Sequence, residues 1–306
     1  MVTVLDSMEN LEFGFQLTPT TEMANHRRLV AAAEAGGLDV VGVQDHPYVP
    51  NLVDAFSLIG DLLARTERLR FFPDVANLPL RPPAMLAKAA GTLDLVSGGR
   101  FELAVGAGGY WDAITKMGVP RLSTSDAAEA LEEAIRIIRA LWRPGEVVRL
   151  SGKHHSVTGT RGGPAPAHPV GIWIGAQGPR AQRLTGRVAD GWAAPIPSYL
   201  PYEKRVEANT TIDRAAEEAG RDPGDVLRMA QLVGTVTKLP GRLQVSEGAE
   251  PVRGTASQWA ELIANLATEQ PFRTFVFWPE EHTVDQVERF AREVVPAARE
   301  LLTAAA

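Results

Sequence analysis

The 306-residue sequence contains no cysteine. This absence excludes disulfide bonds, a thiolate nucleophile and a sulfur-bound metal centre. The sequence also lacks a Gly-x-Ser-x-Gly segment, so a serine nucleophile turn is not expected. Its histidines show no metal-ligand spacing: His154 and His155 are neighbours on a predicted strand and should face opposite ways, while His26, His168 and His282 occur singly as expected surface or capping residues. No metal site is predicted.

A basic surplus and long apolar runs are missing as well. The chain has 31 Lys and Arg against 37 Asp and Glu, a net charge of -6, so it offers no basic face for nucleic acid. No apolar run approaches the roughly 20 residues that a membrane span needs, so no membrane partner is expected. The opening residues MVTVLDSMEN do not resemble a secretion signal, and we expect a cytoplasmic protein.

The sequence does contain a regular alternation of β-rich apolar runs and helical patterns. Hydrophobic residues make up 45% of the chain, enough for a large core. We expect strands near Phe13–Leu17, Asp39–Val43, Leu69–Val75, Phe101–Val105, Gly171–Gly175, Gly191–Ala194, Met229–Thr237 and Thr274–Trp278. We expect helices near Glu22–Ala35, Val53–Thr66, Pro82–Leu95, Asp126–Trp142, Pro179–Val188, Pro201–Ala219, Ala256–Thr268 and Thr283–Leu302. Eight strand-helix units predict an α/β fold, a (β/α)8 TIM barrel formed by one domain over residues 1–306.

Two stretches interrupt this alternation. Residues 144–169 contain a short strand-like pair, VVRL and HHSV, followed by the loop GTRGGPAPAHP, which is too rich in glycine and proline for a regular element. Residues 238–254 form a long polar connection after the seventh strand. On a barrel this second insertion would lie over the active-site mouth. Glu132 and Glu133 are expected on a solvated helix face.

The carboxyl ends of the strands are where a TIM barrel carries its active site. The segment QDHPY places Asp45 and His46 directly after the second strand. Imidazole titrates near neutral pH and suits a proton donor or base, although a hydrogen bond to the loop backbone ahead of Pro47 would explain His46 equally simply.

Two glycine stretches also follow strands. In GRFELAVGAGGYWD no helix is expected at once, so Gly106, Gly108 and Gly109 do not form a dinucleotide fingerprint; a turn and a ligand contact remain alternatives. In GIWIGAQGPRAQRL the strand runs through Gly175–Gly178 into a helix at Pro179, which favours a phosphate on free backbone amides with Arg180 beside it. A plain tight turn is the alternative.

Together with FGFQLTP, LRPPAMLAKAAGTLDLVSGGRFELAVGAGG and GIWIGAQGPRAQRLTGRVADGW, the QDHPY segment resembles the bacterial luciferase-like flavin and deazaflavin oxidoreductases. The resemblance implies a barrel that holds coenzyme F420 or, alternatively, FMN across its mouth, with the phosphate at Gly175–Gly178. It also implies a homodimer.

Residue roles follow from the same resemblance. Asp45 would lie near the coenzyme ring and His46 would act as proton donor or base. A bulge with a non-prolyl cis peptide is implied at Asp74–Val75. The implied coenzyme contacts are Asp45, Asp74, Val75, Ala76, Gly106, Ala107, Gly108, Gly175, Ala176, Gln177, Gly178 and Arg180. Sugar-phosphate-oxidising relatives carry a glutamate where this chain has Gly109, which argues against that chemistry. Tyr110, Trp111 and Trp192 are candidates for the wall of an apolar substrate pocket, although Trp111 also suits a packed interior position.

Three hypotheses from different functional classes follow. The first is an oxidoreductase that moves a hydride between coenzyme F420 and a small organic substrate, with an FMN-dependent monooxygenase as its alternative. The second is a cofactor-free hydrolase, which would need paired carboxylates that the sequence does not place together. The third is a non-catalytic coenzyme-binding protein.

Overall fold

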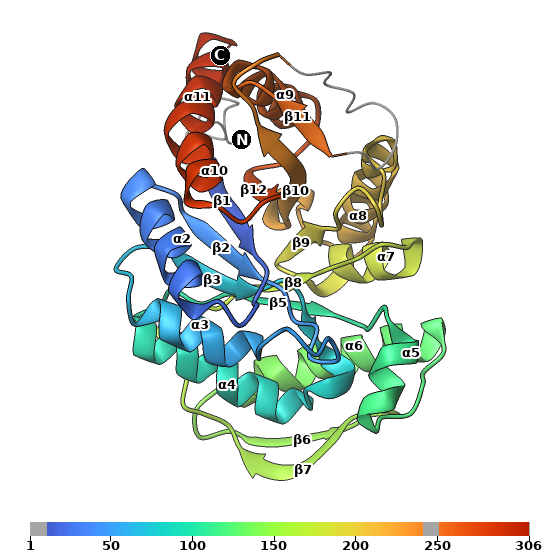
Figure 1. Ribbon diagram of the computed structural model, residues 1–306. Helices are drawn as coiled ribbons and strands as arrows, with labels where there is room; N and C mark the ends of the chain where they lie inside the picture. Colours follow the sequence, from blue (N-terminus) through green and yellow to red (C-terminus); the bar gives the residue numbers. More distant parts are fainter. Residues whose placement is uncertain (1–10, 241–250, 306) are drawn as a thin grey trace.

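Buried apolar stretches recur along the chain and pair as parallel strands around a common axis (Figure 1). The computed structural model describes residues 11–240 and 251–305. The barrel strands are β1 (Glu12–Leu17), β2 (Val40–Val43), β3 (Arg70–Pro73), β4 (Ala76–Asn77), β5 (Leu103–Gly106), β8 (Ile172–Ile174), β9 (Gly191–Ala194), β10 (Leu227–Val236) and β12 (Thr274–Pro279). They lie in the order β3-β2-β1-β12-β10-β9-β8-β5-β4.

The two ends of this order meet. β3 and β4 follow one another along the chain, and Phe71 of β3 pairs with Phe101 just before β5. The result is a nearly closed barrel of nine parallel strands, so the predicted α/β barrel is confirmed. The third predicted strand is divided into β3 and β4 because the chain bulges at residues 74–75, where the Asp74–Val75 peptide bond is cis, as the family resemblance implied.

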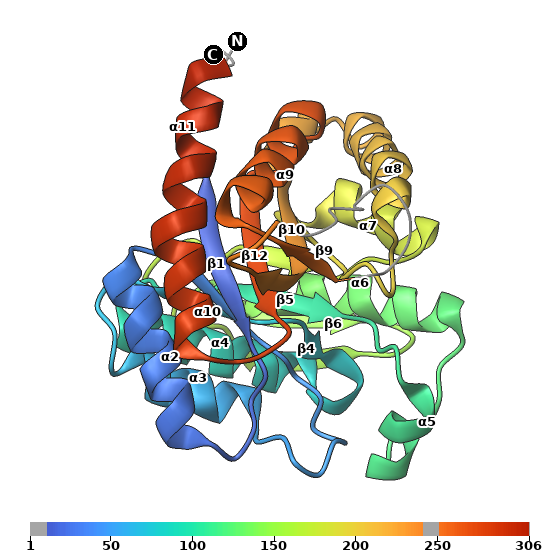
Figure 2. The same cartoon turned by 45° about the horizontal axis from the view of Figure 1, so that its top comes forward.

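Helices surround the strands, and Figure 2 shows α11 running along the outside of β1. Their bounds are α2 (Met23–Gly36), α3 (Ala55–Leu63), α4 (Pro83–Ser97), α5 (Trp111–Ile114), α6 (Thr124–Leu141), α7 (Pro179–Val188), α8 (Arg205–Glu218), α9 (Ala256–Glu269), α10 (Val284–Arg289) and α11 (Val295–Ala305). A π-helical turn, Phe290–Val294, joins the last two. The apolar face of α6 is buried, and Ser123 caps the helix: its hydroxyl accepts the Asp126 N–H at 3.1 Å.

The insertions emerge outside the barrel strands. In the first, β6 (Val147–Ser151) and β7 (Ser156–Arg161) form an antiparallel hairpin, seen below α4 and α6 in Figure 1. The expectation that Gly159 begins an irregular loop was wrong, since residues 159–161 continue β7. Of the second insertion, residues 241–250 lie outside the described residues, and β11 (Val252–Gly254) pairs with the end of β10.

Side chains alternate between the helices and the barrel interior, as strands require. The interior holds a buried apolar layer of Val40, Phe72, Ala104, Trp173, Ala193, Met229 and Val276. Toward the amino ends of the strands, Arg70 forms ion pairs with Glu12 and Glu102. Two residues further toward the carboxyl ends, the same face of the strands carries Gln16, Gly42, Gly106 and Gln231. The candidate site therefore begins at the layer that contains Gln16 and Gln231, and the buried apolar layer lies beneath it.

Candidate functional site

Asp74 and Gln231 join across the barrel interior. The amide Nε2 of Gln231, on β10, donates to Oδ1 of Asp74 at 3.0 Å, and both side chains are buried. Burial raises the pKa of Asp74 to about 7, and the hydrogen bond from Gln231 only partly opposes this shift. Asp74 is therefore a carboxyl group that can hold or release a proton near neutral pH.

Several buried polar atoms around Asp74 have no hydrogen-bond partner. They are the second oxygen of Asp74, the Oδ1 atom of Asn77, and both amide atoms of Gln16. Gln16 packs against Gly42 so closely that a Cβ there would lie 2.1 Å from its Oε1 atom. Buried polar groups are normally paired, so four orphaned atoms under one barrel mouth indicate a place for a polar ligand edge.

Val75 fills the space between two of the glycine positions. A Cβ on Gly106 would lie 2.7 Å from Val75 Cγ2, and one on Gly175 would lie 3.1 Å from both Val75 methyl groups. These glycines therefore let the bulge after β3 press against β5 and β8. Ala76 is fully buried beside it.

Asp45 is not free to face a ligand. Its Oδ2 accepts the Asn77 N–H at 2.9 Å and Arg81 Nε at 2.7 Å, and its Oδ1 accepts Arg81 Nη2 at 2.6 Å. Arg81 also contacts Asp54 at 2.6 Å. The predicted ring contact of Asp45 is thus replaced by an anchoring role: the carboxylate fixes the loop that carries Asn77 and the neighbouring His46.

His46 lies half-buried among aromatic side chains. Its Nδ1 atom is 2.7 Å from the Tyr48 hydroxyl oxygen, and its ring meets Tyr110 edge-on with centroids 5.8 Å apart. Burial lowers the pKa of His46, opposed by the Asp45 carboxylate. Since Nδ1 is held by Tyr48, Nε2 is the nitrogen left for proton transfer. The simple backbone hydrogen bond considered for His46 is replaced by this side-chain pair.

Tyr110 is the outer wall of this cluster. It is 47% exposed, and its hydroxyl group hydrogen-bonds that of Tyr199. Burial and the Tyr110 hydroxyl raise the pKa of Tyr199 to about 12. Trp111, at the start of the short α5, is partly buried. That helix was not expected so soon after the glycine stretch. Within the stretch, Gly108 has a φ of 94°, and a Cβ atom there would lie 2.9 Å from Pro79 Cγ, so the position requires glycine.

Trp192 does not line a pocket. It is fully buried, stacks on Phe272 with centroids 6.1 Å apart, and donates its indole N–H to the Ala176 carbonyl at 3.0 Å. Trp192 supports the Gly175–Gly178 loop from beneath.

The Gly175–Gly178 loop leads directly into α7, as predicted. Gly178 caps the helix without a side-chain hydrogen bond, and Gln177 and Gly178 are exposed. Arg180 points away from this loop toward α6: it donates to Ser125 Oγ at 2.5 Å and lines a cavity of ≈ 630 Å³ with Arg183 outside the barrel. The backbone amides, more than Arg180, are suited to a phosphate.

The single histidines also differ from the expected surface positions. His26 is buried, with Nε2 2.9 Å from the Thr20 carbonyl oxygen. His168 lies 2.7 Å from Asp94 Oδ1 and 3.2 Å from Glu102 Oε1. His282 accepts the Thr18 N–H at 3.3 Å, and burial lowers its pKa. His168 and His282 join segments that are far apart in the sequence, whereas His26 bonds within its own segment.

Sequence reasoning missed four residues of the mouth: Gln16, Arg81, Tyr199 and Gln231. The polar residues Gln16 and Gln231 interrupt apolar strands, which is a usable signal for an interior-facing position. Arg81 and Tyr199 carried no such signal, because only folding brings them beside Asp45 and Tyr110.

The sequence matches the luciferase-like monooxygenase family model over residues 10–242. The chain belongs to this family. Among curated relatives, it is 30% identical to 5,10-methylenetetrahydromethanopterin reductase of Archaeoglobus fulgidus, over 72% of this chain and 64% of the relative. It is 34% identical to the F420-dependent glucose-6-phosphate dehydrogenase of Microbacterium testaceum, over 63% of this chain and 59% of the relative. The chain thus spans somewhat less than two thirds of the curated relatives it matches.

Solved structures of luciferase-like proteins share the fold. The coenzyme F420-dependent tetrahydromethanopterin reductase of Methanopyrus kandleri superposes with a TM-score of 0.79 at 19% identity, covering 94% of this chain and 99% of that one. A riboflavin lyase crystallised with modified FMN superposes with a TM-score of 0.77 at 17% identity, over 95% and 92% of the two chains. Within residues 11–240 and 251–305, no helix combines the length and hydropathy needed to cross a bilayer.

Proposed function

We propose that this luciferase-like protein transfers a hydride between coenzyme F420 and a small organic substrate. The observation that carries the proposal is the set of orphaned polar atoms on Gln16, Asp74 and Asn77 beneath the barrel mouth. They fit the polar edge of a ring system, and beside them Val75 packs against Gly106 and Gly175. The name of the F420-dependent dehydrogenase relative supports the same coenzyme.

The residues that would hold the coenzyme come from three strand ends. Val75 would support the ring, Gln16 and Asn77 would offer hydrogen bonds to its polar edge, and the backbone amides of Gly175–Gly178 would bind the phosphate at the start of α7. Gly106, Ala107 and Gly108 follow at the end of β5, and the fully buried Ala76 pairs with Val105 beside them. When bound, F420 supplies the carbon that gives or accepts a hydride.

His46 would handle the proton that accompanies the hydride. Its lowered pKa keeps the imidazole neutral at pH 7, so Nε2 can accept the proton of a substrate hydroxyl as the substrate carbon loses its hydride. Tyr48 would hold the ring through Nδ1. In the reducing direction the protonated imidazole would return that proton. Tyr110 would close the substrate side, with Trp111 behind it.

An FMN-dependent monooxygenase is the alternative, because a structural neighbour carries FMN in the same fold. The adjacent Asp45 and His46 favour F420, since the family resemblance places this pair in the deazaflavin branch. Asp45 and Asp74, the carboxylates considered for a hydrolase, do not pair with each other: Asp45 is bound by Arg81, and Asp74 by Gln231.

Fluorescence titration with F420 and, separately, with FMN tests the proposal. We expect saturable binding of F420 and much weaker binding of FMN. Tight FMN binding with oxygen uptake after reduction would establish the monooxygenase alternative, and binding of neither coenzyme would overturn both. A third outcome would favour a non-catalytic, coenzyme-binding role. In that case the protein binds F420 but turns over no alcohol or aldehyde, and the bound coenzyme does not react with chemical hydride donors.

A further inference from the structure

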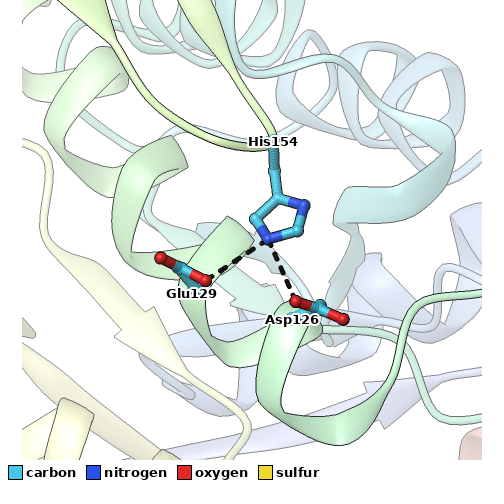
Figure 3. Close-up of side chains that lie close together, drawn as sticks. All are labelled: Asp126, Glu129 and His154. Carbon is cyan, nitrogen blue, oxygen red and sulfur yellow. Dashed lines mark ion pairs between the residues drawn. The ribbon is translucent and has the colours of Figure 1, made fainter.

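The turn of the β6–β7 hairpin carries His154 onto the first turns of α6. Figure 3 shows its imidazole pointing between two carboxylates, with Nε2 3.6 Å from Asp126 Oδ1 and 3.5 Å from Glu129 Oε2. The sequence predicts no metal site because it treats His154 and His155 as strand neighbours. Both histidines lie in the turn, and folding supplies His154 with acidic partners from another element.

The Nε2 atom of His154 has no hydrogen-bond partner, although that atom is shielded from solvent. The side chain is 11% exposed, and Nε2 itself has almost no solvent contact. Buried nitrogen atoms normally have a hydrogen-bond or metal partner, so a cation between His154 Nε2 and the two carboxylates would complete this arrangement. Ligand atoms bound about 2.0–2.1 Å from one metal ion at tetrahedral angles lie roughly 3.3–3.4 Å apart. The two observed separations are close to that value, and all three ligand atoms lie within 4.8 Å of one another.

Neighbouring contacts hold these ligands in place. Glu133 accepts the backbone N–H groups of Lys153 at 2.7 Å, His154 at 2.9 Å and His155 at 2.7 Å, which fixes the turn over α6. The Ser123 hydroxyl donates to Asp126 Oδ2 at 2.7 Å and so leaves Oδ1 directed at the imidazole. Asp126 and Glu129, three residues apart, share one face of the helix.

Lys153 already provides one positive charge at this place. Its Nζ lies 2.5 Å from Asp126 Oδ1 and 3.4 Å from Glu129 Oε2. The side chain is 60% exposed, so the ammonium can withdraw into water when a stronger cation enters. Its contacts are to the two carboxylates, and His154 Nε2 has no hydrogen bond from it.

We propose that Asp126, Glu129 and His154 bind a divalent transition-metal cation of the Zn²⁺ type, with water completing the coordination shell. One imidazole nitrogen and two carboxylate oxygens form a donor set that such ions accept. The ion joins the β6–β7 hairpin to α6, and its role is structural. This site is independent of the proposed redox function.

Calorimetric titration of the metal-stripped, full-length protein with Zn²⁺ tests the site. We expect one equivalent to bind, His154→Ala to weaken binding at least tenfold, and His155→Ala to leave it unchanged, since His155 is the matched neighbour outside the cluster. Lys153→Gln should tighten binding, because it removes the competing ammonium. Cobalt absorption in the visible range should report a low-coordinate site in the wild type and in His155→Ala only.

Two results would overturn the proposal: no stoichiometric binding by the wild type, or equal losses in His154→Ala and His155→Ala. Should His154→Ala fail to fold, Asp126→Asn and Glu129→Gln provide the same test from the helix side. The thermal midpoint offers a further readout, because Zn²⁺ should raise it in the wild type and not in these variants.

Discussion

Arg81 clamps Asp45 through two parallel hydrogen bonds, Nε to Oδ2 at 2.7 Å and Nη2 to Oδ1 at 2.6 Å. This fork-to-carboxylate contact is buried on the Asp45 side, where the side chain is 1% exposed. It connects the loop after β2 to the chain that leaves β4. The position of His46, the next residue, therefore depends on an arginine 35 positions away in the sequence.

Replacing Arg81 by Ala should be strongly destabilising. The Asp45 carboxylate would remain buried without its partner, which typically lowers the free energy of unfolding by about 3–5 kcal/mol. Urea denaturation measures the change. Arg121→Ala serves as the control, because Arg121 pairs with the exposed Asp112 and should contribute less than about 1 kcal/mol. A double variant, Arg81→Ala with Asp45→Asn, should recover part of the loss; the prediction fails if the two changes are simply additive.

Asp74→Asn should stabilise the protein at pH 8. Burial raises the Asp74 pKa from 3.8 to about 7, so the folded protein binds a proton that the unfolded chain has released between these values. Stability from this group is fully present below pH 3.8 and is lost as the pH rises through 7. The gain from Asn should approach about 4 kcal/mol at most above pH 7 and vanish near pH 4. Equal effects at pH 4 and pH 8 would show that Asp74 ionises normally.

His46 should set the acidic limb of the activity profile. Because burial lowers its pKa below 6.5, activity that needs neutral imidazole should persist to a lower pH than an ordinary histidine allows, and fall as the pH drops through the folded pKa. His46→Ala should reduce kcat by roughly 10²–10⁴-fold while F420 binding stays within about twofold. Tyr48→Phe should shift the acidic limb with a smaller loss of kcat. Unchanged turnover in His46→Ala would remove the catalytic assignment.

Glu133 should hold the β6–β7 hairpin in place. Burial alone would raise its pKa, but three backbone N–H donors outweigh that effect and lower it. The ionised form is therefore the stabilising one, and its contribution is present above the ordinary pKa of 4.5 and lost as the pH falls through the lower folded value. Glu133→Ala should reduce stability by about 2 kcal/mol or more at pH 7. Glu132→Ala, next along the helix and paired with the exposed Arg187, should have an effect below about 1 kcal/mol.

The homodimer implied by the family resemblance stays a prediction, and α4 is the face on which we propose it forms. Met85 and Val96 of this helix are 65% and 73% exposed, and Leu95 is 42% exposed. Met85→Glu with Val96→Glu should yield a monomer in analytical ultracentrifugation, because charged side chains are poorly tolerated in the core of an interface. Val206→Glu alters an exposed apolar residue on α8 and should leave the assembly unchanged. Dissociation by Val206→Glu alone would place the interface elsewhere.

The sequence predicted the barrel because strand and helix periodicities are local properties of the chain. The strand ends at Leu17 and Val43 and the strand-turn-helix at Gly175 were recognisable from neighbouring residues, whereas the cis bond at Asp74–Val75 was expected only from the family resemblance. His46 could be named for the same reason, since it follows a strand directly.

What the sequence could not determine were contacts between distant segments. Folding turned Asp45 from a ligand contact into the partner of Arg81, moved Trp192 into the core, and placed His154 beside Asp126 and Glu129. Glu133, which has the appearance of a solvated charge, became the acceptor for the hairpin turn. Periodicity reports which side of its own element a residue occupies, whereas its partners depend on how the elements pack, and only the tertiary structure decides that.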